Sequence, residues 1–411
     1  MRRRYLLAAT LVLSALFQDA SFARGSDAYG KPAGFLRLDI PPNSERLAST
    51  PFIPFAPSFD ACFVGQLTGA PEASDADQIA KWDATAQSYV AAFKADGTGD
   101  LGKDGKWFAL GSKWIASPLT LLPGEGFYIF NNHAVAQQVF LCGQVVLDDC
   151  QPIAFPSGLT LFASPFSSGL TLEANHRFGS GRIVAPDLNW CQFDGDNDQW
   201  LDQDGHPTDA KLLSGIGYWF HRHAASTLVW RPTRPYDNPF ANCGGAAPQI
   251  TAMALSEAQD ALTLSIACSG APGETLEIFH QDINPGEDFN PGLGWNLSAS
   301  GTNTNGASVV SWTDFSVANP HARVYLVARQ DIDSDSDGRS DANELFVHGT
   351  NPNDRGNAGL LGKKRQDNTT QATALDTDKD GLSDTLEATH GTDAKNVNDP
   401  GILSVKIQSW L

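Results

Sequence analysis

The sequence of 411 residues predicts a mainly β protein. Short apolar and aromatic runs are separated by Gly, Pro, Asp and Asn, a pattern that indicates antiparallel strands joined by tight turns. The chain holds 38 glycines and 24 prolines but only 2 methionines, which is typical of β-rich extracellular domains. From residue 34 to about residue 232 the pattern occurs twice. We therefore expect two tandem degenerate β-rich repeat units, with further β structure after them.

The N-terminal segment has the three parts of a secretory signal peptide. Three arginines precede an apolar run from Tyr5 to Phe17, and small residues at Ser21 and Ala23 mark a cleavage site after Ala23. An apolar run of about 13 residues is too short to span a bilayer. We expect residues 1–23 to direct export to the cell surface or the extracellular space, with no transmembrane segment elsewhere. The alternative is an N-terminal anchor.

The chain is strongly acidic, with a formal net charge of −19. Removal of residues 1–23 takes away three arginines and Asp19 and leaves a net charge of −21. Such a charge repels nucleic acid phosphates and attracts cations, so we expect no nucleic acid partner. The 388 residues that follow residue 23 are enough for two to four domains.

The cysteine count is even, and an even count in an exported chain favours disulfide bonds. Six cysteines allow fifteen connectivities. If each domain closes its own bond, the pairs are Cys62–Cys142, Cys150–Cys191 and Cys243–Cys268. The sequence contains no Cys-x-x-Cys spacing of the kind that binds zinc.

Ordered motif matches define the two repeat units, which we place at residues 24–145 and 146–235. The offset between the copies falls from 114 to 104 to 91, so the second unit is a shortened version of the first. The matched positions are 51–52 with 165–166, 79 and 83 with 183 and 187, and 121–130 with 212–221. The last pair contains a Gly-x-Gly-aromatic run without the third glycine of a phosphate loop. We interpret it as a turn that enters a buried strand.

The strand pattern is clear in several other segments. Residues 35–40 alternate apolar and polar side chains, and 75–94 is interpreted as strands around a turn, with a short helix as the alternative. After a linker rich in Pro, Gly and Asn at 233–248, the strand candidates are 262–266, 276–279, 309–312 and 324–327. Several short strands in about 80 residues predict an Ig-like or fibronectin-like β-sandwich at 246–330.

An acidic motif follows the last of these strands. Residues 333–344 read D-x-D-x-D-G-x-x-D-x-x-E, with carboxylates at positions 1, 3, 5, 9 and 12 and glycine at position 6. This is the spacing of a twelve-residue calcium loop, in which side-chain oxygens and one backbone carbonyl surround the ion and the glycine permits a sharp turn. The predicted ligands are Asp333, Asp335, Asp337, the carbonyl of Arg339, Asp341 and Glu344.

The same motif returns at 376–387. Its predicted ligands are Asp376, Asp378, Asp380, the carbonyl of Leu382, Asp384 and Glu387. Two carboxylates 4 Å apart repel by about 1 kcal/mol in water and about 4 kcal/mol at an effective dielectric constant of 20. A loop with little apolar content cannot offset several such pairs, so we expect both loops to need Ca²⁺. The alternative is a solvated acidic linker.

The residues around the loops carry a family resemblance. Each loop is followed by about two helical turns and then by Gly-Thr, and the first unit continues to Pro352. Residues 331–399 therefore resemble bacterial thrombospondin type 3 repeats, which implies calcium binding. The second unit departs from the family pattern at Ala394, and the insertion at 353–375 separates two units that usually adjoin. A strand replaces the first helix of an EF-hand, so the loop is only EF-hand-like.

Two weaker metal candidates have simpler explanations. The stretch from Asp194 to Asp204 begins D-x-D-x-D but has Gln199 where a calcium loop has glycine, so we prefer a polar hairpin turn to a third calcium site. His221 and His223 lie two apart on a predicted strand and share a face. No third ligand is identifiable, so we prefer a surface pair to a metal site.

The sequence has no recognisable catalytic motif. It lacks G-x-S-x-G, H-E-x-x-H, a P-loop and a Cys–His pairing, so we expect no enzyme. A glycoside hydrolase stays a minor alternative, because the spacing of its two carboxylates is a property of the fold.

The expected function is an exported calcium-binding protein with a structural or adhesive role, whose partners are calcium ions and extracellular glycans or surface proteins. The alternative is a carbohydrate-binding or accessory protein for polysaccharide use, which an exposed planar row of tryptophans would favour. The candidates are Trp82, Trp107, Trp114, Trp190, Trp200, Trp219 and Trp230. The expected domain order is 1–23, 24–145, 146–235, 246–330, the calcium repeats at 331–399, and a tail at 400–411.

Overall fold

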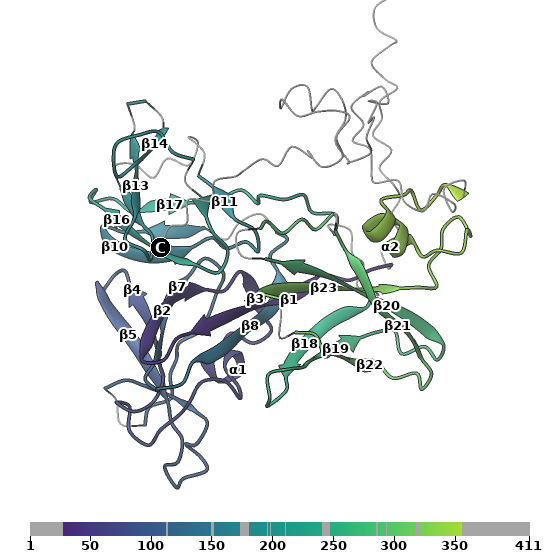
Figure 1. Ribbon diagram of the computed structural model, residues 1–411, viewed down its shortest axis with the longest axis horizontal. Coiled ribbons are helices and arrows are strands. Elements are labelled where there is room, and N and C mark those ends of the chain that lie inside the picture. The colour runs from purple at the N-terminus through teal and green to yellow at the C-terminus, as the bar shows by residue number, and fades with distance from the viewer. Residues whose placement is uncertain are drawn as a thin grey trace, which may run out of the picture. The chain divides into compact units, whose positions relative to one another are not determined.

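The computed structural model describes residues 28–355, and these belong to one compact unit (Figure 1). Short gaps in the description fall at 112–113, 149–151, 173–180, 195, 198, 210, 241–246, 285–286, 293 and 318–319. The predicted signal peptide, the second acidic loop at 376–387 and the tail at 400–411 lie outside the described residues. The described part is mainly antiparallel β structure, as the sequence predicts. None of its helices is long and apolar enough to cross a membrane.

The first repeat unit contributes a five-stranded antiparallel sheet. Its strands, in spatial order, are β2 (Ser44–Ser49), β7 (Gly126–Asn131), β4 (Gln78–Asp83), β5 (Ser88–Lys94) and β6 (Trp107–Ala109). Strands β4 and β5 pair from Gln78↔Phe93 to Asp83↔Ser88, so 75–94 forms strands around a turn and not a helix. The short helix α1 (Phe59–Cys62) places Phe59 against buried Trp107, with ring centroids 5.7 Å apart.

The second repeat unit contributes a sheet with the same order of matched strands. In spatial order these are β10 (Gly158–Ala163), β16 (Gly217–Arg222), β12 (Arg182–Val184), β13 (Trp190–Asp194) and β14 (Gln199–Asp202). The flanking strands correspond as well. In the first unit β1 (Ala33–Ile40) pairs with β8 (Gln137–Val145), and in the second β9 (Ile153–Phe155) pairs with β17 (Leu228–Trp230). The bridge Ser58↔Thr120 has its counterpart in β11 (Leu170–Thr171) with β15 (Lys211–Leu212).

The two sheets meet through reciprocal backbone contacts. The Ser49 amide donates to the Gly215 carbonyl at 3.1 Å, and the Ala163 amide, at the position matched to Ser49, donates to the Gly124 carbonyl at 2.9 Å. Gly124 and Gly215 are the first glycines of the Gly-x-Gly runs, and both adopt the left-handed φ that favours glycine, 88° and 78°. The predicted turn is therefore also the place where the two units join.

The second glycine of each run allows the sheets to approach. A Cβ at Gly126 would lie 2.8 Å from Leu161 Cγ, and a Cβ at Gly217 would lie 2.7 Å from Leu47 Cδ1. Leu47 and Leu161 occupy matched positions, so each unit inserts the same leucine against the same glycine of the other. Any larger residue must displace that leucine.

Strand β1 joins the first unit to the predicted sandwich. The six-stranded sheet has the order β21 (Asn296–Asn303), β20 (Glu274–Ile283), β23 (Ala322–Arg329), β1, β8 and β3 (Phe52–Pro54). β1 pairs with β8 over eight residues and with β23 over four. One sheet thus combines strands from 24–145 and 246–330, whose boundary in the sequence stays a prediction.

The other layer of the predicted sandwich is a three-stranded sheet. It consists of β18 (Gln249–Leu255), β19 (Leu262–Ala267) and β22 (Val309–Asp314). Its buried side chains share a hydrophobic cluster with the six-stranded sheet, including Phe35 of β1 and Phe140 of β8. The first-unit strands therefore complete one face of this core.

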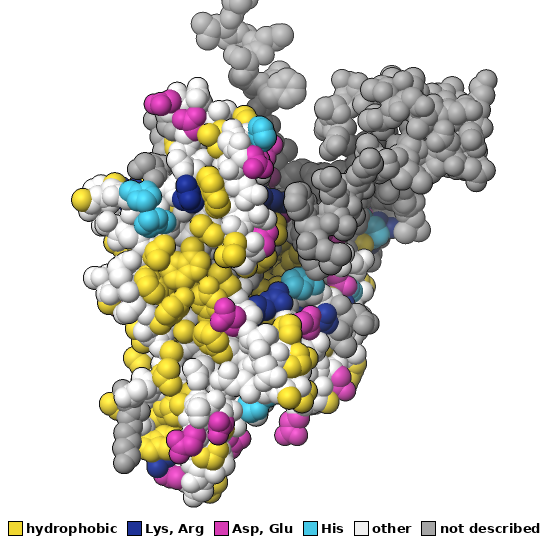
Figure 2. Space-filling view, turned by 60° about the vertical axis from the view of Figure 1, so that its left-hand side comes forward, with side chains coloured by type: hydrophobic (Ala, Val, Ile, Leu, Met, Phe, Trp, Pro, Cys, Tyr) yellow, Lys and Arg dark blue, Asp and Glu magenta, His cyan; other side chains and the backbone are white. Residues whose placement is uncertain are grey.

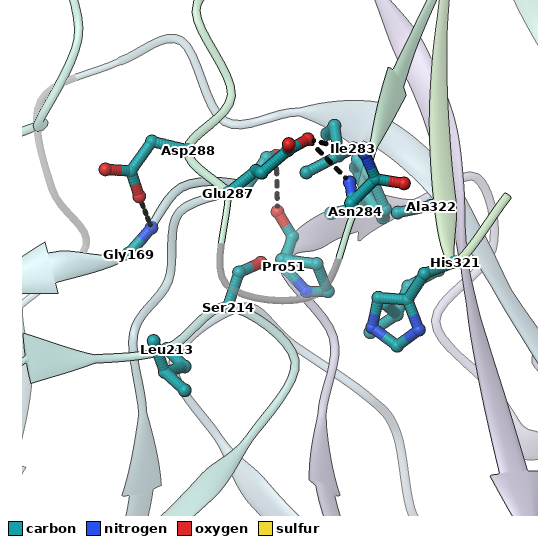
Figure 3. A pocket seen from close by; sticks show the side chains of 13 residues that line it. Pro51, Gly169, Leu213, Ser214, Ile283, Asn284, Glu287, Asp288, His321 and Ala322 are labelled. Atoms are coloured by element: carbon teal, nitrogen blue, oxygen red, sulfur yellow. Dashed lines mark hydrogen bonds between the residues drawn. The ribbon is translucent and has the colours of Figure 1, made fainter. Parts of the chain in front are cut away.

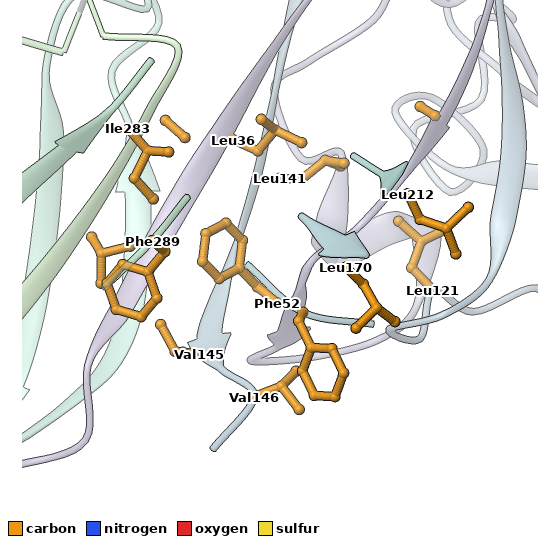
Figure 4. Close-up of a cluster of buried hydrophobic side chains, with 14 of the residues drawn as sticks. Leu36, Phe52, Leu121, Leu141, Val145, Val146, Leu170, Leu212, Ile283 and Phe289 are labelled. Carbon is orange, nitrogen blue, oxygen red and sulfur yellow. The ribbon is translucent and has the colours of Figure 1, made fainter. Parts of the chain in front are cut away.

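A larger hydrophobic cluster fills the other side of β1 and connects both repeat units with the sandwich (Figure 4). Leu36 of β1 and Leu141 of β8 lie on this side, while Phe35 lies on the other. Among the side chains that Figure 4 labels are Phe52, Leu121, Val145, Leu170, Leu212, Ile283 and Phe289. Both faces of β1 are covered from Ala33 to Leu36, whereas its second half alternates buried residues with the less buried Arg37 and the exposed Asp39.

The described cysteines are free thiols. Cys62 and Cys142, one of the three predicted pairs, have no disulfide bond in this structure, and burial raises the pKa of Cys142 to about 12, with the neighbouring Cys62 adding to the rise. The pairings of Cys191 and Cys268 involve Cys150 and Cys243, which lie outside the described residues.

The close approach of the repeat sheets predicts a specific sensitivity. Gly217→Ala should lower the free energy of unfolding by about 1–3 kcal/mol, because the added methyl overlaps Leu47 at a packed contact. Denaturant titration at fixed calcium concentration measures the change.

Gly301→Ala in β21 is the matched control, since a Cβ there meets no atom within 4 Å. It should leave the free energy of unfolding unchanged or raise it by up to about 1 kcal/mol. Equal stability of the two variants would contradict the proposed role of Gly217.

Candidate metal centre

The first acidic loop lies directly after β23, as the sequence predicts. The loop leads into a short helix, α2 (Asp341–Asn343), and a π-helical turn, η1 (Glu344–His348) (Figure 1). Ser340 caps the helix by accepting a hydrogen bond from the Asn343 amide at 3.1 Å. Gly349 ends the turn in the left-handed conformation, with φ of 65°.

The loop folds around its own carboxylates. Asp333 Oδ2 accepts a hydrogen bond from the Gly338 amide at 2.9 Å, and Asp335 Oδ1 accepts one from the Asp337 amide at 3.1 Å. Gly338 has φ of 96°, which the sharp turn requires. Ligand atoms of Asp333, Asp335 and Asp337 lie within 4.8 Å of one another and are close enough to hold a metal ion.

Several carboxylate oxygens in this loop are buried without a hydrogen-bond partner. They are Asp335 Oδ2, Asp337 Oδ2 and Glu344 Oε2. Burial raises the pKa of Glu344 to about 7, and the nearby aspartates add to the rise. Loss of hydration also raises the pKa of Asp335, with Asp337 as the second cause. Burying a carboxylate without a partner destabilises the folded state, and a hard cation that binds oxygen ligands removes this destabilisation. The donor set therefore fits Ca²⁺.

Two of the predicted ligands have partners that the motif does not reveal. Both oxygens of Asp341 accept hydrogen bonds from Ser334, from the amide at 2.7 Å and from the hydroxyl at 2.6 Å. Glu344 Oε1 accepts a hydrogen bond from Thr350 Oγ1 at 3.0 Å, which aims its free oxygen. Thr350 belongs to the Gly-Thr pair that follows the helix, so the family pattern contains this signal. The role of Ser334 could not be predicted from the motif, because the motif allows any residue at that position. The Arg339 amide donates to Asp337 Oδ1 at 2.9 Å.

The loop and its helix are part of the folded body. Ser340 Oγ donates a hydrogen bond to the buried Glu277 carboxylate of β20, and the Asp341 amide donates to the Ile332 carbonyl at 2.9 Å. Ala342 and Glu344 are fully buried. This part of the predicted repeat segment at 331–399 contacts β20 of the six-stranded sheet, and the boundary at residue 331 stays a prediction.

Phe346 anchors the helix in the main core. Its ring lies 5.0 Å from Tyr29, 5.4 Å from Phe240 and 6.2 Å from Trp295, measured between centroids. Tyr29 in turn bridges to Ala328 at the end of β23. The calcium loop thus connects three distant segments of the chain.

The weaker metal candidates differ from this loop. The stretch 194–204 lies in the β13–β14 hairpin, where the register places Asp194 opposite Gln199 and Asp202 opposite Cys191. The two aspartates are therefore three residue pairs apart, about 10 Å along the strands. Asp202, Asp204 and His206 gather at the next turn, where Asp202 Oδ1 accepts hydrogen bonds from the other two amides.

The His221 and His223 rings lie 4.2 Å apart. The pKa of His221 is lowered by burial, then by His223 and by Arg182. A neighbouring arginine disfavours a metal cation at this pair.

A pocket between the second unit and the six-stranded sheet is small (Figure 3). Its volume of about 30 Å³ suits one or two water molecules. Its two carboxylates make structural contacts. The Asn284 side chain donates to Glu287 at 2.9 Å, and Asp288 pairs with Lys211 at 2.9 Å and accepts from the Gly169 amide at 3.0 Å.

The tryptophans are divided between core and surface. Trp107, Trp200 and Trp230 are buried, while Trp82, Trp114, Trp190 and Trp219 are partly exposed. Trp82 and Trp219 are in contact, but their planes cross at 80°. These two tryptophans therefore form a crossed pair and not part of a planar row.

Comparison with known proteins supports the metal centre. Residues 333–355 and 376–394 match the family model of the bacterial TSP3 repeat, a calcium-binding repeat. The match covers both acidic loops that the spacing predicts, and it confirms the resemblance to thrombospondin type 3 repeats. Searches of curated proteins and of solved structures gave no match.

The packing of Phe346 predicts that the loop helix contributes to global stability. Phe346→Ala should lower the free energy of unfolding by about 3–5 kcal/mol, because it removes a buried ring from a core contact. Denaturant titration with saturating calcium tests this.

Val347→Ala is the control, since that side chain is 37% exposed on the same helical turn. Its effect should stay within about 0.5 kcal/mol. Similar small effects of both substitutions would show that the helix does not belong to the core.

Proposed function

We propose that the protein is an exported, calcium-stabilised protein with a structural or adhesive role at the cell surface or in the extracellular space. The observation that carries the proposal is the group of buried, unpaired oxygens on Asp335, Asp337 and Glu344. A second support is the match to the bacterial TSP3 repeat, which is typical of extracellular proteins. Export rests on the signal-peptide pattern of residues 1–23.

In this proposal the first ion is held by the free oxygens of the loop. Asp333, Asp335 and Asp337 supply side-chain oxygens, Arg339 its carbonyl, and Glu344 its free oxygen. Asp341, whose two oxygens each accept one hydrogen bond from Ser334, acts directly or through a water molecule. The second site uses Asp376, Asp378, Asp380, Leu382, Asp384 and Glu387 in the same roles.

A structural role for calcium follows from how the loop is attached. Calcium sensors move a pair of helices, whereas here a strand enters the loop and a single buried helix leaves it. Ion binding then stabilises a segment that is already packed on the core. It does not move a pair of helices apart to expose a binding groove. We also propose that the two repeat units arose by duplication, on the basis of their shared strand order.

We further propose that the chain has no catalytic activity. The small volume of the pocket in Figure 3 and the structural contacts of Glu287 and Asp288 support this view. Hydrolysis of a glycan would need two facing carboxylates with room for a sugar between them.

The calcium assignment predicts a stoichiometry. Calorimetric titration of the wild-type chain with Ca²⁺ should show two sites, and Asp335→Asn with Glu344→Gln should leave one. The substitutions keep the side-chain shapes while removing the charges that hold the ion.

Asp331→Asn is the control, because Asp331 pairs with Arg329 outside the loop. It should retain both sites. Two sites in the double variant, or no calcium uptake by the wild type, would rule out the assignment.

A further inference from the structure

The outer faces of the two repeat sheets form one continuous surface with a band of aromatic rings. The Trp82 ring lies 5.0 Å from Tyr89 and 5.2 Å from Trp219, and the Tyr89 ring lies 6.0 Å from Tyr128, all measured between ring centroids. These four residues are called the aromatic band. Tyr89 is 51% exposed, and Leu159 of β10, which lies opposite His221 in the strand register, is also exposed. Figure 2 shows a broad hydrophobic area on this side of the molecule, with histidine, basic and acidic side chains near its edge.

Hydrogen bonds hold two rings of the band in place. Trp82 Nε1 donates to the Leu159 carbonyl of the other unit at 2.8 Å, and Trp219 Nε1 donates to Tyr128 Oη at 3.1 Å. Tyr128 and Trp219 occupy matched positions in the two units, so the band is centred on their junction. The rings are ordered in advance, which lowers the entropic cost of binding a ligand.

A basic edge borders the band on β12 and β16. Register places Val184 beside Trp219, and Arg182 beside His221 one row further along. The Arg182 guanidinium lies 3.8 Å over the Trp190 ring, and within the described ranges no carboxylate is in salt-bridge distance of it. The groups near His221 that affect its charge are His223 and Arg182, both basic. Arg182 thus places a positive charge at this edge of a chain whose net charge is −19.

We propose that this face binds a glycan that carries an acidic sugar residue, with pyranose C–H faces on the aromatic band and the carboxylate at Arg182. Aromatic faces carry negative partial charge and attract C–H groups and cations. Arg182 offers a paired set of donors that matches a carboxylate. The choice of a glycan as ligand rests on the proposed adhesive role. The binding face itself does not include the calcium loop.

The crossed rings and the net charge narrow the ligand class. Rings that meet at 79–80° around Trp82 form a stepped surface, which suits a single soluble glycan chain better than a flat crystalline polysaccharide. The acidic remainder of the chain repels a dense polyanion, whereas isolated acidic sugars in a neutral glycan avoid this repulsion. At physiological salt the Debye length is about 8 Å, so more distant acidic residues are largely screened. The interaction of the glycan carboxylate with Arg182 then outweighs their repulsion.

The test uses glucuronoxylan oligosaccharides and the same oligosaccharides with the carboxylate reduced to an alcohol. Calorimetry should show binding of the acidic ligand and about tenfold weaker binding of the reduced one, since a charge-assisted hydrogen bond is lost. Arg182→Gln should weaken binding of the acidic ligand about tenfold and leave binding of the reduced ligand unchanged, because the two changes remove the same contact. Tyr89→Ala should weaken the binding of both ligands about fivefold.

Matched controls separate these effects from folding and from calcium. Phe315→Ala removes an 80% exposed ring on the sandwich, and Arg231→Gln removes an exposed arginine elsewhere; both should bind like the wild type. The Asp335→Asn, Glu344→Gln variant should keep glycan binding while losing calcium at the first site, so the glycan test and the calcium test can fail independently. No binding by the folded wild type, equal binding of the two ligands, or an equal effect of Arg182→Gln on both would overturn the proposal.

Discussion

The pairing of β1 with both β8 and β23 is the interaction on which the remaining structure depends. Near the start of the described chain, β1 joins β8 and β3 of the first unit to β20, β21 and β23, which lie near the other end of the described chain. Phe35 faces the core shared with the three-stranded sheet, and Leu36 faces the core shared with the repeat units. The residues just before β1 carry Tyr29, against which the calcium-loop helix packs. Loss of this strand would therefore separate three parts of the molecule at once.

Local chemistry made many elements predictable. The strands β19, β20 and β22 coincide with predicted segments in which apolar and polar side chains alternate, and β23 coincides with a predicted segment that is continuously apolar and buried on both faces. Glycine-rich turns were recognisable for the same local reason. The partner of β1 was not predictable, since alternation indicates that a segment pairs but not with which strand. The second glycines of the Gly-x-Gly runs were identified as turn residues, although Gly126 and Gly217 also admit a leucine from the other unit.

The candidate metal centre was more accessible to sequence reasoning than the surrounding packing. Calcium geometry demands oxygen ligands at fixed spacing within twelve residues, so Asp333 to Glu344 carry the signal by themselves. The contacts of Asp341 with Ser334 and of Phe346 with Tyr29 depend on the folded backbone. Their consequence is that the loop is held on two sides: by its own carboxylates and by an aromatic core that it helps to complete.

The reciprocal contact of Leu47 with Gly217 and of Leu161 with Gly126 has the form of an isologous interface, in which the same patch appears on both partners. Two separate units of this kind would associate only above a concentration set by their affinity. Placing both on one chain replaces that dependence with an effective concentration on the order of millimolar. Covalent linkage therefore keeps the junction, and the aromatic surface built across it, intact at any dilution.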